Sequence, residues 1–91
     1  MTTGYQASKS ELLNRLSRIE GQVRGVSRMV EEERYCIDML TQIGAIEAAL
    51  DKVALGLVDE HTRHCLAETE GDERAEKVDE LMGALGRFVG R

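Results

Sequence analysis

The chain has 91 residues, of which 42% are apolar and 32% charged, with one Phe, two Tyr and neither Trp nor Pro. This length accommodates one domain, and this composition fits a folded helical protein and argues against an intrinsically disordered one. β-Branched residues occur singly and without hairpin turn signals, which argues against a β-rich fold. The sequence therefore predicts a single all-α domain over 1–91, with a mobile N-terminal arm over 1–7.

The net charge is −5, but the charge is unevenly distributed along the chain. Residues 1–30 carry five basic and two acidic groups, a balance of +3, whereas residues 66–91 carry four basic and seven acidic groups, a balance of −3. An acidic total argues against a nucleic-acid partner. The N-terminal third nevertheless has the sign that an anionic partner requires, so we expect any such contact to come from there.

The sequence predicts a cytoplasmic protein without a membrane partner. No apolar run approaches the roughly 20 residues that cross a bilayer, and the first ten residues do not have the pattern of a secretory signal. Both cysteines and both histidines fall between Tyr35 and Cys65. Because thiols stay reduced in the cytoplasm, two cysteines indicate metal or redox chemistry more often than a structural disulfide.

The first predicted helix begins after Ser8, which has the pattern of a capping box with Glu11. Apolar residues then recur every three or four positions for about seven turns, and the helix is predicted to end near residues 32–34. Gly21 and Gly25 interrupt it one turn apart, a spacing that often marks the close approach of another helix or a phosphate. The apolar stripe consists of Leu12, Leu16, Ile19, Val23, Val26 and Val30.

The second predicted helix begins around Tyr35 and continues to Cys65 with the same spacing. Its apolar arc is wider than one neighbouring helix can cover, so we expect burial on two sides. Because a chain of three helices cannot easily provide that cover, copies of the chain are predicted to associate. The arc consists of Met39, Leu40, Ile43, Ile46, Leu50, Val53, Leu57 and His61, with alanines alongside.

A third, shorter helix is predicted after a break over residues 68–72, in which Gly71 acts as the stop. Asp72 is predicted to cap this helix. The expected buried face is formed by Val78, Leu81, Met82, Leu85 and Phe88.

A candidate metal site lies at the two ends of the second helix. His61 and Cys65 are four positions apart, so their side chains share one helix face and can bind one ion. Cys36 precedes His61 by 25 residues, about 37 Å along a straight helix, and cannot join them within one chain. It can join them if two copies pack antiparallel, which gives two equal Cys-His-Cys sites in a two-fold dimer. Two thiolates and one imidazole favour Cu(I), whereas Zn²⁺ usually asks for a fourth ligand. His64 could supply a fourth ligand but is expected to point elsewhere.

Four segments of the sequence resemble the copper-sensitive operon repressor family (CsoR/RcnR-type), and the similarity covers nearly the whole chain from Tyr5 on. The resemblance implies an antiparallel four-helix-bundle dimer, a dimer of such dimers, and a transcriptional repressor rather than an enzyme. Its affinity for operator DNA would fall when an inducer binds at the dimer interface. The segments are residues 18–25 (RIEGQVRG), 35–38 (YCID), 40–43 (LTQI) and 60–65 (EHTRHC).

The resemblance also implies the inducer and the residues around it. Cys36, His61 and Cys65 match the Cu(I) sensors of the family, with Cys36 donated across the interface. Nickel and cobalt sensors have a histidine in place of Cys65, and persulfide sensors lack the histidine present here as His61. Tyr35 and Glu80 match family positions next to the ligands, where a carboxylate on the free nitrogen of His61 would fix the orientation of its ring.

No helix-turn-helix or zinc finger is visible, so operator DNA is expected to contact a helical surface. Each basic residue taken alone is more often part of a solvated helix face, whereas several together would make binding strongly salt-dependent. The candidates for this contact are Lys9, Arg15, Arg18, Arg24 and Lys52.

Two other functions stay open on the sequence. One is a thiol- or persulfide-responsive repressor of the same fold that uses Cys36 and Cys65. The other is a helical metal-buffer or redox protein without a role on DNA, which the acidic total permits. Operator titration of the reduced protein with Cu(I), Zn²⁺ and a persulfide donor separates these alternatives.

Overall fold

The computed structural model describes residues 9–90, with Cys65 described by its backbone alone. These residues form three α-helices, α1 (Lys9–Glu31), α2 (Cys36–Glu60) and α3 (Gly71–Val89), and a π-helical segment, η2 (His61–Leu66), that continues α2. No strand occurs within this range, so the all-α, three-helix prediction is confirmed. The Ser8 cap and the arm over 1–7 lie outside the described residues.

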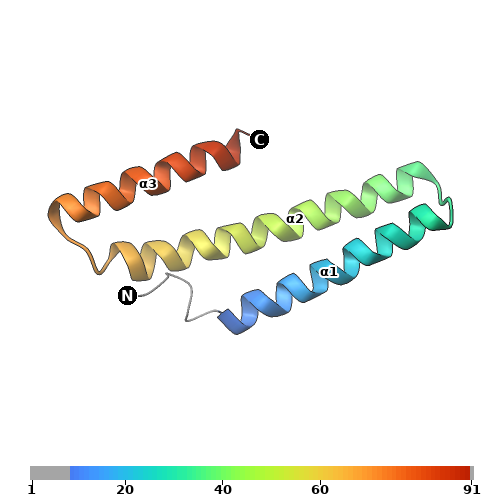
Figure 1. Cartoon of the computed structure of the whole chain (residues 1–91), viewed down its shortest axis with the longest axis horizontal. Coiled ribbons are helices and arrows are strands. Elements are labelled where there is room, and N and C mark those ends of the chain that lie inside the picture. Colours follow the sequence, from blue (N-terminus) through green and yellow to red (C-terminus); the bar gives the residue numbers. More distant parts are fainter. Residues whose placement is uncertain (1–8, 91) are drawn as a thin grey trace.

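Consecutive helices run antiparallel (Figure 1). α1 and α2 form a long hairpin, and α3 folds back along the C-terminal half of α2, on the side away from α1 in this view. The molecule is long and thin, with extents of 56 × 29 × 13 Å. None of the described helices is long and apolar enough to span a membrane.

The hydrophobic core lies inside the α1–α2 hairpin and is small. Fully burying one aliphatic side chain contributes about 1.5–3 kcal/mol, so a core of four such residues provides limited stability. Part of the predicted α1 stripe stays outside it, since Val23 and Val30 are 49% and 59% exposed. The core residues are Leu12, Ile19, Ile46 and Val53, with Leu16, Val26 and Ala49 packed against them.

The turn between α1 and α2 has the hydrogen bonds of a Schellman motif. The Arg34 amide donates to the Met29 carbonyl at 2.9 Å, and the Glu33 amide donates to the Val30 carbonyl at 3.1 Å. Glu33 has a φ of 54°, in the left-handed region that usually holds glycine in this motif. For a residue with a Cβ this conformation costs roughly 1–2 kcal/mol. The turn reverses the chain just before Cys36 and so places this residue at the start of α2.

α3 begins differently from the prediction. Its N-cap position is Glu70, which makes no side-chain capping hydrogen bond, and Asp72 lies in the first turn. Gly71, predicted as a stop, is the first residue of the helix and has a φ of 59°, which glycine adopts without a steric penalty. The prediction that Asp72 caps α3 is therefore wrong, although its carboxylate still lies at the positive end of the helix dipole.

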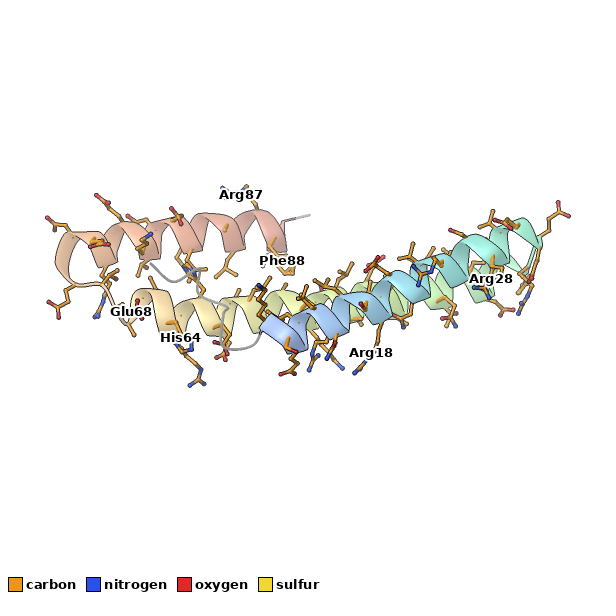
Figure 2. The ribbon with its side chains drawn as sticks, turned by 60° about the horizontal axis from the view of Figure 1, so that its bottom comes forward. Arg18, Arg28, His64, Glu68, Arg87 and Phe88 are labelled. Carbon is orange, nitrogen blue, oxygen red and sulfur yellow. The ribbon has the colours of Figure 1, made fainter. Side chains whose placement is uncertain are left out.

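The apolar face predicted for α3 is not buried within the single chain. α3 contains no buried residue. Phe88 is half-buried and points from α3 towards α2 (Figure 2). Val78 and Met82, in contrast, are 39% and 60% exposed. The apolar period of α3 was predicted correctly, but its burial was not, because one chain does not supply enough helix surface to cover it.

The αL position of the α1–α2 turn gives a stability prediction. Glu33→Gly is expected to raise the free energy of unfolding by about 1 kcal/mol, because glycine adopts a positive φ without a Cβ clash. Thermal unfolding followed by circular dichroism measures this change. Glu33→Gln is the matched control, since it keeps the Cβ and removes the charge from the run of three glutamates. An equal gain in both variants would show that charge repulsion, and not backbone strain, is the cause.

Candidate metal centre and nucleic-acid interface

One face of α2, continued by the first residue of η2, carries two of the three predicted metal ligands. Positions that alternate four and three residues apart share a helix face and form the seam of a helix pair. Cys36 and His61 stand at the two ends of such a row. We call this row the α2 seam, and it consists of Cys36, Leu40, Ile43, Glu47, Leu50, Ala54, Leu57 and His61.

Most of the α2 seam is left exposed by the chain itself, whereas Ala54 and His61 are half-buried. Leu40 is 56% exposed and Leu57 is 39% exposed, and the Cys36 thiol is free and exposed. A neighbouring arc of α2, with Ile46 and Val53, is the one that packs against α1. α2 therefore has two apolar arcs, and α1 covers one of them.

The C-terminal part of the candidate site lies in η2, where the backbone is π-helical. A π-helix is a widened helical turn with hydrogen bonds between residues i and i+5. Such segments are rare in proteins, and those that occur often lie at functional sites. His61 and Cys65 are four positions apart, close to one turn of the helix. The prediction of one continuous α-helix to Cys65 is wrong in this respect, because the α-helical part ends at Glu60.

Two polar pairs accompany η2. Arg63 Nε donates to the Asp59 carboxylate oxygens at 3.0 and 3.1 Å. His64 Nε2 lies 2.9 Å from Glu60 Oε2. This second contact is close but poorly directed, and it leaves the buried Glu60 Oε2 without a hydrogen bond from the described residues. The His64 imidazole is thus engaged with its own helix turn.

The predicted ligand set does not come together within one chain. Among residues 9–90, no three His, Cys, Asp or Glu side chains gather as a metal site, and the side chain of Cys65 lies outside the described part. Cys36 opens α2 and His61 follows its last residue. Tyr35 is 68% exposed, and Glu80 is exposed on α3. A site that contains both Cys36 and His61 therefore needs a second chain.

The structure brings three of the five predicted DNA contacts together. Arg15 and Arg18 of α1 and Lys52 of α2 line a hollow of about 370 Å³ between the two helices, which we call the cationic hollow. Arg18 extends outward from α1 in Figure 2. Lys9 and Arg24 do not line this hollow. The remaining lining residues are Ile19, Gln22, Ala45, Ala48 and Ala49.

Sequence reasoning missed Gln22 and the alanines of the cationic hollow. Neutral residues give no charge signal, and the alanines were assigned to filling beside the apolar arc of the second helix. The signal that could have found them is a shared register. Arg15, Arg18 and Gln22 follow one another by three and four positions on α1, and Ala45, Ala48 and Lys52 do so on α2.

A second hollow of about 520 Å³ adjoins the first, and more acidic than basic side chains line it. Arg15 and Lys52 line both hollows. The other charged residues of the second, which we call the acidic hollow, are Glu11, Asp59 and Glu60. Arg15 Nη2 donates to Glu11 Oε1 at 3.0 Å. The sign of the charge therefore changes along the α1–α2 groove at Arg15 and Lys52.

The sequence matches the family described as metal-sensitive transcriptional repressor over residues 8–87. The chain belongs to this family. Its members are transcriptional repressors and not enzymes, so DNA is a partner of this protein and the predicted absence of catalysis is confirmed.

Relatives and a solved structure cover nearly the whole chain. The copper-sensing transcriptional repressor RicR of Mycobacterium tuberculosis is 51% identical over 89 residues, which cover 94% of this chain and 93% of RicR. The copper-sensing repressor CsoR of Bacillus subtilis is 44% identical over 91 residues, which cover 97% and 90% of the two chains. The crystal structure of the copper-sensing repressor CsoR with Cu(I) from Geobacillus thermodenitrificans NG80-2 matches with a TM-score of 0.86 and 43% identity, covering 98% of this chain and 94% of that one.

Proposed function

We propose that this protein is a Cu(I)-responsive transcriptional repressor that binds operator DNA without copper and releases it when Cu(I) binds between two chains. The observation that carries the proposal is the uncovered α2 seam, which ends in Cys36 on one side and in His61 on the other. The similarity to copper-sensing repressors, one of them solved with Cu(I), supports it. Because a repressor works where the DNA is, we expect the protein in the cytoplasm.

The spacing of the α2 seam supports an antiparallel pair of α2 helices in one particular register. A two-fold axis midway between Glu47 and Leu50 pairs each seam residue with another seam residue of the second chain. Cys36 then faces His61 of the partner subunit. In the same register two apolar layers form, Leu40 with Leu57 and Ile43 with Ala54, and the central layer pairs Glu47 with Leu50. One arrangement therefore satisfies both the hydrophobic seam and the ligand set.

The donor set fits Cu(I). Cys36 from one chain would act with His61 and Cys65 from the other, so the ion would be held by two thiolates and one imidazole. Soft thiolates and low coordination suit Cu(I), whereas structural zinc sites are usually closed by four ligands. We place Tyr35 and Glu80 next to this set, where a carboxylate can accept a hydrogen bond from the free nitrogen of His61 and orient its ring.

Operator DNA would be bound by the basic surface of α1 and α2. Arg15, Arg18 and Lys52 in the cationic hollow are the central contacts in this proposal, and Lys9 and Arg24 add positive charge along α1. A homodimer that assembles into a homotetramer repeats this surface, which allows an acidic chain to hold a duplex. If Cu(I) and DNA prefer different quaternary arrangements, a coupling of about 3 kcal/mol lowers DNA affinity about a hundredfold.

Copper is expected to release the protein from DNA. Fluorescence anisotropy of a labelled operator duplex, measured under reducing conditions, should show an affinity for wild type about a hundredfold weaker with Cu(I) than without it. Cys36→Ser and Cys65→Ser should bind the duplex but lose the copper response, because each variant lacks one thiolate. His61→Ala should lose the response as well, because the link from the ion to Glu80 is gone.

His64→Gln is the matched control for these variants, since His64 contacts Glu60 and should keep a copper response like that of wild type. Equal release of wild type and His61→Ala by Cu(I) would contradict the role of His61. Release by a persulfide donor but not by Cu(I), together with a Cys36–Cys65 linkage found by mass spectrometry, would contradict the copper proposal and support the thiol-responsive alternative.

The α2 seam is expected to hold two chains together. Leu50→Glu removes an apolar contact and places a carboxylate opposite the partner subunit's Glu47 in the middle of the proposed interface, so like charges repel there, and it should shift the protein towards monomers in sedimentation velocity experiments. Leu55→Glu serves as the control, because Leu55 is 65% exposed and does not belong to the seam. Dissociation by both substitutions, or by neither, would argue against the register proposed above.

A further inference from the structure

The cationic hollow has a floor of small side chains. Ala45 and Ala48 are exposed and Ala49 is half-buried, and all three line the hollow from α2. Arg15, Arg18 and Gln22 border it from α1, and Lys52 closes the α2 side at the end shared with the acidic hollow. No acidic residue lines the cationic hollow within the described part of the chain. A recess lined by three cations and no carboxylate is suited to an anion, and the Glu11 carboxylate that pairs with Arg15 lies beyond it, in the acidic hollow.

The shape of the cationic hollow indicates which part of a nucleic acid it can receive. Reading base edges usually requires a helix or ribbon that protrudes into a groove of the duplex. The cationic hollow is concave, so it fits a convex object, and the sugar-phosphate strand is the convex and uniformly negative part of DNA. Methyl side chains at Ala45 and Ala48 let that strand approach the helix, which longer side chains would prevent.

We propose that the cationic hollow seats one phosphodiester strand of operator DNA, with Ala45 and Ala48 as contact surface and Gln22 donating a hydrogen bond to a phosphate at the neutral end. Arg15, Arg18 and Lys52 neutralise phosphates along the rest of the seat. The acidic hollow ends the seat, because Glu11, Asp59 and Glu60 repel a phosphate. This inference rests on the proposed function and deepens it by naming the part of the DNA that is bound and three uncharged contact residues.

The direct test enlarges one alanine side chain on the floor of the cationic hollow without changing the charge. The ligand is a fluorescein-labelled duplex that copper-free wild-type protein enriches from a randomised library, and affinity is measured by anisotropy. Ala48→Leu is expected to weaken binding by roughly tenfold or more, because its side chain keeps the strand away from the neutralising cations. Ala48→Ser stays small and should bind like wild type. Ala75→Leu makes the same enlargement at an exposed position of α3 and should also bind like wild type.

The outcomes separate the inference from the proposed function. If the wild-type protein enriches no duplex, the proposed function fails. If wild type binds and Ala48→Leu binds equally well, the strand does not lie on the alanine floor and the inference is overturned. Cu(I) titration of each variant, which should match wild type, excludes damage to the copper site. Gln22→Glu serves as a second variant without added bulk, and unchanged affinity in it would also overturn the inference.

Salt dependence distinguishes the neutral contact from the ionic ones. The slope of log K against log salt falls by about 0.9 for each phosphate that a protein cation no longer neutralises. Arg18→Ala should therefore lower both the affinity and the magnitude of the slope over about 50 to 200 mM salt. Gln22→Ala should lower the affinity and leave the slope unchanged, because its amide releases no counterion. A slope that changes equally in both variants would show that Gln22 acts only by holding Arg18.

Discussion

The mismatch between the apolar surface of α2 and the helix surface available to cover it is the constraint on which this structure depends. A hairpin with four buried core residues uses one arc of α2 and leaves the α2 seam outside. Apolar surface of this extent is stabilised by removal from water, so it favours a second copy of the same helix. On the register proposed above, the same burial brings Cys36 next to the partner subunit's His61. One helix face would then serve both subunit association and metal binding.

The two functional surfaces use different arcs of α2 and meet at its C-terminal end. In the proposed function, the α2 seam carries the copper ligands Cys36 and His61, whereas Lys52 and the alanine row lie on the DNA side. Glu60 connects them, since it lines the acidic hollow and directly precedes His61. Copper and DNA therefore do not compete for the same side chains. Any effect of one on the other has to pass through the position of α2 and η2, as expected for linkage between distinct sites.

The sequence was sufficient for those features that depend on periodicity. The three helices and the two-sided arc of α2 follow from apolar spacing of three and four. Local features that depend on backbone detail were not predictable in this way. Asp72 has the residue type of a cap, but Gly71 takes a positive φ and moves the helix start, and the π-helical turn of η2 leaves no compositional signature. The neutral part of the cationic hollow was missed because Gln22 and Ala48 become neighbours only across the hairpin.

The antiparallel register of the α2 seam has a genetic consequence. On this register each copper site takes Cys36 from one chain and His61 from the other, so two different loss-of-function alleles can complement one another. A chain without the Cys36 thiol, paired with a chain without the His61 imidazole, concentrates both defects in one site and leaves the other site whole. Cells carrying both alleles would thus contain dimers with one working sensor, although neither allele alone can produce any.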